Sequence, residues 1–77
     1  MDRYFIHIVD GTIVRDEDGE ALPDVAAART AALRTLGEIL RSREERFWED
    51  GHVRVFVENA AGEVVVNVET RDLLASA

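Results

Sequence analysis

The chain contains no cysteine, a single proline and few aromatic residues: one tryptophan, one tyrosine and three phenylalanines. Without cysteine it has neither disulfide bridges nor a cysteine-based zinc site, two devices that often stabilise small domains. No apolar run approaches the roughly 20 residues of a membrane helix, and the N-terminus lacks the pattern of a secretory signal. We therefore expect one cytoplasmic domain, residues 1–77, stabilised by its core, by self-association or by both.

Positive charge is also scarce, because sixteen acidic residues face nine arginines and no lysine, which gives a net charge of −7. A surplus of negative charge repels phosphate backbones and anionic membranes at long range. We therefore expect no nucleic-acid partner and no membrane partner. Apolar residues make up 47% of the chain, enough for a globular fold, and charged residues make up 32%, which favours solubility.

Two β-hairpins are predicted from the alternation of side chains. Residues 3–9 are rich in β-branched and aromatic residues, which favours a strand, and residues 12–15 resume the pattern. The Asp10-Gly11 pair between them indicates a hairpin closed by a type I′ turn, which needs positive φ at both central positions. Residues 52–58 and 63–69 predict a second hairpin around a turn at residues 59–62.

One long helix is predicted between the hairpins, after a polar loop at residues 16–20. Pro23 suits its first turn, Asp24 adds a carboxylate at the positive end of the helix dipole, and good helix formers continue to about Phe47. Gly51 is a stop signal, and the sequence leaves open where the helix ends between Ser42 and Gly51. The apolar face of this helix comprises Leu22, Val25, Ala32, Leu33, Leu36, Ile39, Leu40 and Phe47.

These elements predict an α+β fold of order ββαββ, in which an antiparallel sheet of two hairpins packs on one long helix. Because side chains alternate along a strand, one helix covers only one face of the sheet. Thr70 is a candidate cap for a last short turn through Ala77. The side chains expected under the helix are Tyr4, Ile6, Ile8, Val53, Val55, Val57, Val64, Val66 and Val68.

The uncovered face of the sheet carries apolar side chains interleaved with charged ones. A contiguous apolar patch rimmed by charge usually marks an interface, so we expect a homodimer formed through this face or through a strand edge. The alternative is a scatter of exposed apolar groups, as on every monomer. Trp48 either closes the bottom of the core or anchors a protein partner. The candidate interface residues are Phe5, His7, Val9, Arg54, Phe56 and Val65.

Two arginines, Arg29 and Arg43, fall near the centre of the apolar stripe of the helix, where a charge needs a partner. We expect Arg29 to form a structural ion pair with Asp10 or Asp16, and an anion site at Arg29 is the alternative. Arg43 either extends past the sheet edge or lies where the helix loosens near Ser42.

No catalytic, cofactor-binding or metal-binding residue is predicted. The acidic turn around Gly19 fails the calcium-loop pattern, because aligning Gly19 with the glycine of that pattern puts Val14 and Val25 at ligand positions. His7 and His52 lack a placed third ligand for a metal. Neither serine has the setting of a nucleophile, and no glycine-rich phosphate loop is present. We therefore expect no cofactor and no enzymatic activity.

The chain shares a combination of residues with a known family. Arg3-Tyr4-Phe5, His7, Asp10-Gly11, Asp16 and Gly19 are followed by Leu22-Pro23-Asp24, Ala27-Ala28-Arg29 and a closing strand pair with Gly62 in its turn. This combination resembles domain-of-unknown-function family 6894, small bacterial and chiefly alphaproteobacterial proteins, although residues 41–51 depart from its usual pattern. The resemblance implies no activity, cofactor or catalytic residue. More loosely, the chain resembles HicB-type antitoxin domains at the level of the fold.

Three functions are compatible with these features. The preferred one is a small self-associating interaction or regulatory module, because of the second apolar sheet face. The first alternative is an antitoxin-like binder whose acidic surface masks a basic protein partner. The second is a minor metal- or anion-binding enzyme, which would be stabilised by its ligand.

Overall fold

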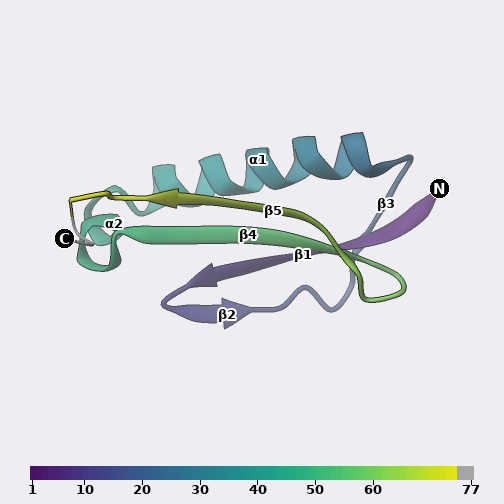
Figure 1. Ribbon diagram of the computed structural model, residues 1–77, viewed down its shortest axis with the longest axis horizontal. Coiled ribbons are helices and arrows are strands. Elements are labelled where there is room, and N and C mark those ends of the chain that lie inside the picture. Colours follow the sequence, from purple (N-terminus) through teal and green to yellow (C-terminus); the bar gives the residue numbers. More distant parts are fainter. Residues whose placement is uncertain (75–77) are drawn as a thin grey trace.

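The computed structural model describes residues 1–74 and has an α+β fold, as predicted. A five-stranded antiparallel sheet packs against one long helix (Figure 1). The order ββαββ is confirmed, with one added short strand before the long helix and one added short helix after it. The elements are β1 (Asp2–Asp10), β2 (Thr12–Val14), β3 (Glu20–Leu22), α1 (Val25–Ser42), α2 (Glu44–Asp50), β4 (His52–Asn59) and β5 (Val64–Arg71).

The strand order of the sheet is β2-β1-β4-β5, and β3 pairs with the same side of β1 as β2 does. β2 pairs with the end of β1, where Ile8 lies opposite Val14, and β3 pairs with its beginning, where Tyr4 lies opposite Glu20. The prediction of a polar loop over residues 16–20 is therefore wrong at its last residue, because Glu20 already belongs to β3.

Both predicted hairpins are confirmed, but the first turn differs from the prediction. Gly11 has a φ of 78°, whereas no residue other than glycine has a positive φ among residues 1–74. A type I′ turn needs positive φ at both central residues, so the predicted type I′ turn at Asp10-Gly11 is wrong. Val9 lies opposite Ile13, and the chain reverses over the three residues between them.

The long predicted helix is interrupted, and it begins at Val25 instead of at Pro23. Asp24 is the N-cap, since its carboxylate accepts a hydrogen bond from the Ala27 N–H at 2.9 Å. Pro23 therefore precedes the cap instead of lying in the first turn. α1 ends at Ser42, and Arg43, with φ −131° and ψ 32°, leaves the helical conformation before α2 begins. The single helix to Phe47 is wrong, and the loosening near Ser42 is confirmed.

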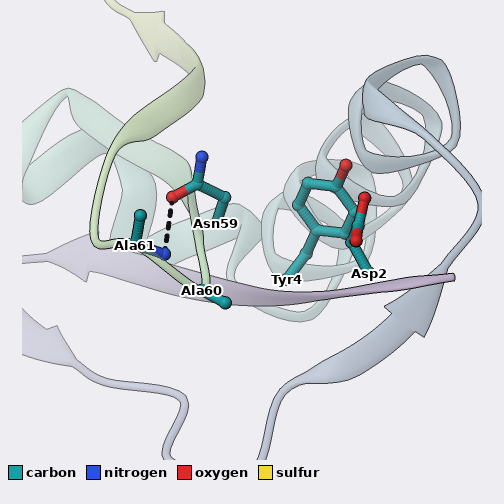
Figure 2. A pocket seen from close by; sticks show the side chains of 5 residues that line it. All are labelled: Asp2, Tyr4, Asn59, Ala60 and Ala61. Carbon is teal, nitrogen blue, oxygen red and sulfur yellow. Dashed lines mark hydrogen bonds between the residues drawn. The ribbon is translucent and has the colours of Figure 1, made fainter.

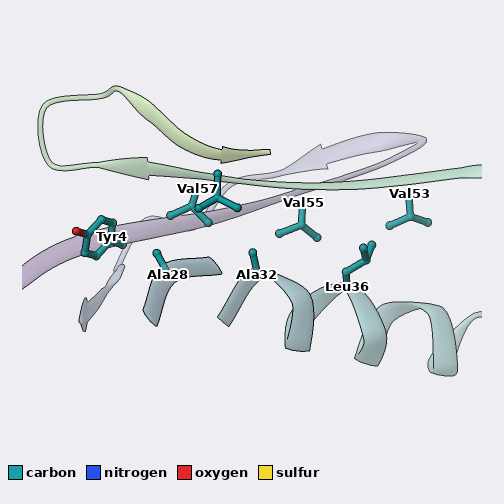
Figure 3. Packing of buried hydrophobic residues seen from close by; sticks show 8 residues of the cluster. Tyr4, Ala28, Ala32, Leu36, Val53, Val55 and Val57 are labelled. Carbon is teal, nitrogen blue, oxygen red and sulfur yellow. The ribbon is translucent and has the colours of Figure 1, made fainter. Parts of the chain in front are cut away.

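The core lies between α1 and the middle of β4 (Figure 3). Ala28, Ala32 and Leu36 project from the helix toward the valines of β4, and these valines are fully buried: Val53, Val55 and Val57. Alanine at two successive turns lets the helix approach the sheet closely, and it costs little side-chain entropy. The prediction that the valines of β4 face the helix is confirmed.

Two apolar positions are more exposed than predicted. A bulge between Val57 and Glu58 shifts the register of β5, so that Val64 lies opposite Glu58 and is 56% exposed. The same shift packs Val65 against the core cluster instead of leaving it on the uncovered face. Leu33 is 59% exposed, because it lies on the flank of α1 and not on the stripe that contacts the sheet.

The C-terminal segment differs from the predicted capped turn. β5 continues through Thr70 to Arg71, so Thr70 belongs to the sheet and not to a helical cap. Asp72 then donates its backbone N–H to the carbonyl of Gly51 at 2.7 Å. The turn predicted through Ala77 extends into residues 75–77, which lie outside the described residues. Of the helices formed by residues 1–74, none combines the length and the apolar character needed to cross a membrane.

Candidate interaction surfaces

The sheet face opposite α1 is closed by its own side chains. Phe56 is only 8% exposed and His7 only 4% exposed, although no helix covers them. The His7 ring lies 4.9 Å from the Phe56 ring, and the Arg54 guanidinium lies 4.8 Å from the centre of that ring on the same face. The expected exposed apolar patch at Phe56 and His7 is therefore not present, whereas Phe5, Val9 and Arg54 are partly exposed there.

His7 connects this face to the loop that follows β2. Its Nδ1 accepts a hydrogen bond from the Asp16 N–H at 3.0 Å, so Nδ1 carries no proton and the neutral ring is protonated at Nε2. His7 Nε2 lies 2.6 Å from the Glu58 Oε1, in a close contact without the alignment of a good hydrogen bond. Arg15 reaches the same oxygen at 3.7 Å. The loop is thus tied to both β1 and β4.

Asp16 is the central acceptor of the acidic turn. Its Oδ1 accepts hydrogen bonds from the Gly19 N–H at 3.0 Å and the Asp18 N–H at 3.2 Å, and its Oδ2 accepts one from the Ile6 N–H at 3.1 Å. The bond from Gly19 is the main cause that lowers the pKa of Asp16, helped by those from Ile6 and Asp18 and opposed by partial burial. The sequence predicts a polar loop here and, as one of two pairings, an ion pair from Asp16 to Arg29, but it does not predict these hydrogen bonds from backbone N–H groups. Residues 1–74 bring together no cluster of three metal-binding side chains.

The ion pair predicted for Arg29 is not formed. Asp10 binds Arg43, which reaches it from the break between the two helices, and both side chains are largely buried. Asp16 is occupied by backbone N–H groups, as described above. Arg29 is exposed and has no ion pair within residues 1–74. The helix break thus turns Arg43, and not Arg29, toward the first hairpin.

The end of the molecule around α2 exposes large apolar side chains. Trp48 is 65% exposed and stacks edge-to-face on Phe47, with ring centres 5.1 Å apart. The prediction that Trp48 closes the bottom of the core is therefore wrong, and its alternative role as an anchor for a protein partner stays a prediction. Leu73 and Leu74 are 77% and 85% exposed, and the backbone bond from Asp72 to Gly51 brings their segment next to the end of α2.

A shallow pocket of about 250 Å³ lies beside the turn between β4 and β5 (Figure 2). Asp2, Tyr4, Asn59, Ala60 and Ala61 line it. The Asn59 amide oxygen is already used, because it accepts hydrogen bonds from backbone N–H groups of the turn, Ala61 among them. The lining therefore supplies one carboxylate and one phenol, without a nucleophile and an adjacent base.

The two edges of the sheet are very different. The outer edge of β1 is covered by β3 at its beginning and β2 at its end, and the Asp16 carboxylate fills the gap between them. β5 forms the opposite edge, runs for eight residues beside α1 and has no further strand next to it within residues 1–74 (Figure 1). Its last residues are charged: Glu69 binds His52 at 2.6 Å and Arg71 at 3.3 Å, and the bond to His52 is the first cause of the lowered pKa of Glu69.

These features define a small α+β domain with one helix-covered face, one face closed by polar side chains and one open edge strand. The chain belongs to the family described as Domain of unknown function (DUF6894), whose model matches residues 3–71. The family resemblance predicted from the sequence is thereby confirmed, whereas the bacterial origin and the looser likeness to HicB-type antitoxin domains stay predictions. No curated protein and no solved structure matches the chain.

Proposed function

We propose that the chain is a small, non-catalytic interaction module of the bacterial cytoplasm that works as a homodimer. The observation that carries this proposal is the open edge of β5, which is eight residues long and has no further strand next to it within residues 1–74. The unpaired backbone groups of such an edge form a ready template for another strand.

The contrast between the two edges favours an interface at β5. Proteins protect exposed edges with short strands, proline, charged side chains (lysine above all), β-bulges or a covering segment. The β1 edge is protected in this way by two three-residue strands and by Asp16, whereas β5 is long, contains neither proline nor lysine, and has its bulge at its beginning, away from its last residues. A domain of 77 residues buries a smaller fraction of its surface than larger domains do, so it gains more from an added interface.

Self-association is tested by measuring the molar mass in solution over a wide range of protein concentrations. Sedimentation equilibrium at moderate salt suits this measurement, since salt screens the repulsion between two chains that each carry a net charge of −7. We expect the mass of two chains, with a dissociation that depends on concentration. The mass of one chain at every concentration would contradict the proposal.

A second candidate function is an antitoxin-like binder of a basic protein partner, and the exposed Trp48 favours it. Tryptophan is a frequent anchor of protein interfaces, and α2 surrounds it with four acidic residues, Glu44, Glu45, Glu49 and Asp50. A basic protein that copurifies with the wild-type chain from its native host, but not with Trp48→Ala, would support this function. Leu33→Ala, which removes another exposed apolar side chain, is the matched control.

A further inference from the structure

The hydrogen-bonding phase of β5 determines which of its residues can pair with a further strand. Gly51 lies opposite Asp72 in continuation of the register His52–Arg71, and the Asp72 N–H donates to the Gly51 carbonyl. Backbone groups of successive residues in an antiparallel strand point alternately to its two sides. The backbone groups of Val66, Val68 and Thr70 therefore point toward β4, and those of Asn67, Glu69 and Arg71 point to the open edge.

The far side of the sheet gives an independent check of this phase. Val55 lies opposite Val68 and Phe56 opposite His7, so the same alternation turns His7 toward β4 and Ile6 toward the outer edge of β1. The Ile6 N–H does point outward, since it donates to the Asp16 carboxylate. The phase assigned to β5 is thus consistent with the opposite edge of the sheet.

We propose that β5 pairs with β5 of a second copy in an antiparallel, two-fold arrangement centred on Thr70. This inference rests on the self-association proposed above and specifies its surface. The proposal rests on the positions of Glu69 and Arg71. They flank Thr70, and the backbone groups of both point to the open edge of β5. Centred on Thr70, the pairing puts each Glu69 opposite Arg71 of the partner subunit and the two Thr70 residues opposite each other. It therefore uses the charged end of β5, residues 69–71, and leaves the valines at the beginning of the strand outside the strand pair.

The charges of Glu69 and Arg71 favour the register centred on Thr70 over the two registers next to it. A pairing centred on Glu69 puts the two Glu69 carboxylates directly opposite each other, which destabilises a sheet. A pairing centred on Val68 puts Glu69 opposite Asn67 of the partner subunit and leaves Arg71 opposite a valine. Only the Thr70 register of these three forms two opposite-charge pairs, which matter for an acidic chain, and a threonine pair, which is also favourable across strands.

A charge-swap experiment tests the register without altering the core. Glu69→Arg alone places arginines opposite arginines, and Arg71→Glu alone places glutamates opposite glutamates, so we expect each variant to sediment as a single chain. Mixed in equal amounts, the two variants regain both opposite-charge pairs, and we expect a heterodimer. Glu38→Arg, a reversal of the same size on the exposed surface of α1, is the control and should dimerise like the wild type.

Cysteine cross-linking provides a second readout, free of background because the chain has no native cysteine. Residues opposite each other in a non-hydrogen-bonded antiparallel pair have Cα atoms about 4.5 Å apart, within the range of a disulfide. Thr70→Cys should therefore form a disulfide-linked dimer on mild oxidation. Val68→Cys, two residues away on the same face, should not.

The outcomes separate this inference from the broader function. A wild-type dimer that survives both charge reversals, or that cross-links through Val68→Cys and not Thr70→Cys, would overturn the register and leave the proposed self-association standing. A wild-type chain that is monomeric at all concentrations would overturn both. Circular dichroism of each variant identifies any that fails to fold, and the mixing experiment then decides, because an unfolded chain is not rescued by its charge-swapped counterpart.

Discussion

The carboxylate of Asp16 accepts a hydrogen bond from the Ile6 backbone N–H, at 3.1 Å, at the point where the outer edge of β1 has no neighbouring strand. β2 leaves β1 after the pair Ile8–Val14, and β3 joins it at the pair Tyr4–Glu20. One side chain thus replaces the backbone carbonyl that a continuous strand would supply. The acidic turn is therefore a structural part of the sheet edge.

Removal of this carboxylate should destabilise the fold and open the edge locally. Asp16→Ala leaves the N–H groups of Ile6, Asp18 and Gly19 without their acceptor, and we expect a loss of about 2 kcal/mol in the free energy of unfolding. Urea denaturation measures the loss, and amide hydrogen exchange should speed up first at Ile6. Glu17→Ala, an exposed change in the same turn, should alter stability by less than about 0.5 kcal/mol.

Asp16 should also make the stability depend on acidic pH. Its folded-state pKa is lowered, chiefly by the Gly19 hydrogen bond, so the charged form stabilises the folded state. A lowered pKa contributes stability that is fully present above the unfolded pKa of about 4, and that is lost as the pH falls through the folded pKa. Denaturation curves between about pH 6 and pH 2 should show this loss for the wild type, and a weaker dependence for Asp16→Asn. Equal slopes for the two proteins would contradict this role of Asp16.

The hydrogen bond from the Asp16 N–H to His7 Nδ1 predicts the tautomer of this buried ring. We expect neutral His7 to carry its proton on Nε2, next to the Glu58 carboxylate, instead of sampling both tautomers. Nitrogen-15 NMR of the imidazole distinguishes the two nitrogens directly. A proton on Nδ1 of His7 would show that this hydrogen bond is absent in solution.

The sequence predicted the repetitive parts of this fold better than its irregular ones. Alternation and helical periodicity placed the two hairpins, the helix and the valines of β4, because each signal repeats over many residues. Two single-residue features were not predicted, the bulge after Val57 and the turn of the Asp16 carboxylate toward β1, and the break at Arg43 was predicted only as one of two alternatives. The bulge inserts one residue into an otherwise regular alternation, and Asp16 and Arg43 depend on contacts with β1 that no periodicity encodes. For the same reason Phe56 was expected to be exposed, since periodicity cannot show that Arg54 and His7 pack over it.

Two glycines should respond to alanine in opposite directions. Gly19 has a φ of +73°, and a Cβ there would lie 2.8 Å from the Phe5 ring and 2.9 Å from the Arg3 side chain. We expect Gly19→Ala to destabilise the protein by about 2 kcal/mol through strain and steric overlap. Gly37 lies in α1 with no atom near such a Cβ, so Gly37→Ala should stabilise the protein by about 0.5–1 kcal/mol. Melting temperatures that moved in the same direction would contradict this pair of predictions.

The ion pair between Arg43 and Asp10 fixes the helix break against the first hairpin, and its loss should be costly. The two side chains are 12% and 19% exposed, so each charge depends on the other for compensation. Arg43→Met leaves Asp10 as an unpaired, largely buried carboxylate, and we expect a loss of about 3 kcal/mol in the free energy of unfolding.

A double-mutant cycle separates this pairing from the packing of the arginine stem. Asp10→Asn added to Arg43→Met should restore part of the stability, because the remaining buried charge is removed. Arg29→Met is the matched control: Arg29 is exposed and has no ion pair within residues 1–74, so its replacement should change stability by less than about 0.5 kcal/mol. If Arg29→Met destabilised the protein as much as Arg43→Met, the assignment of the ion pair to Arg43 would be contradicted, and Arg29 would bind the first hairpin as the sequence predicts.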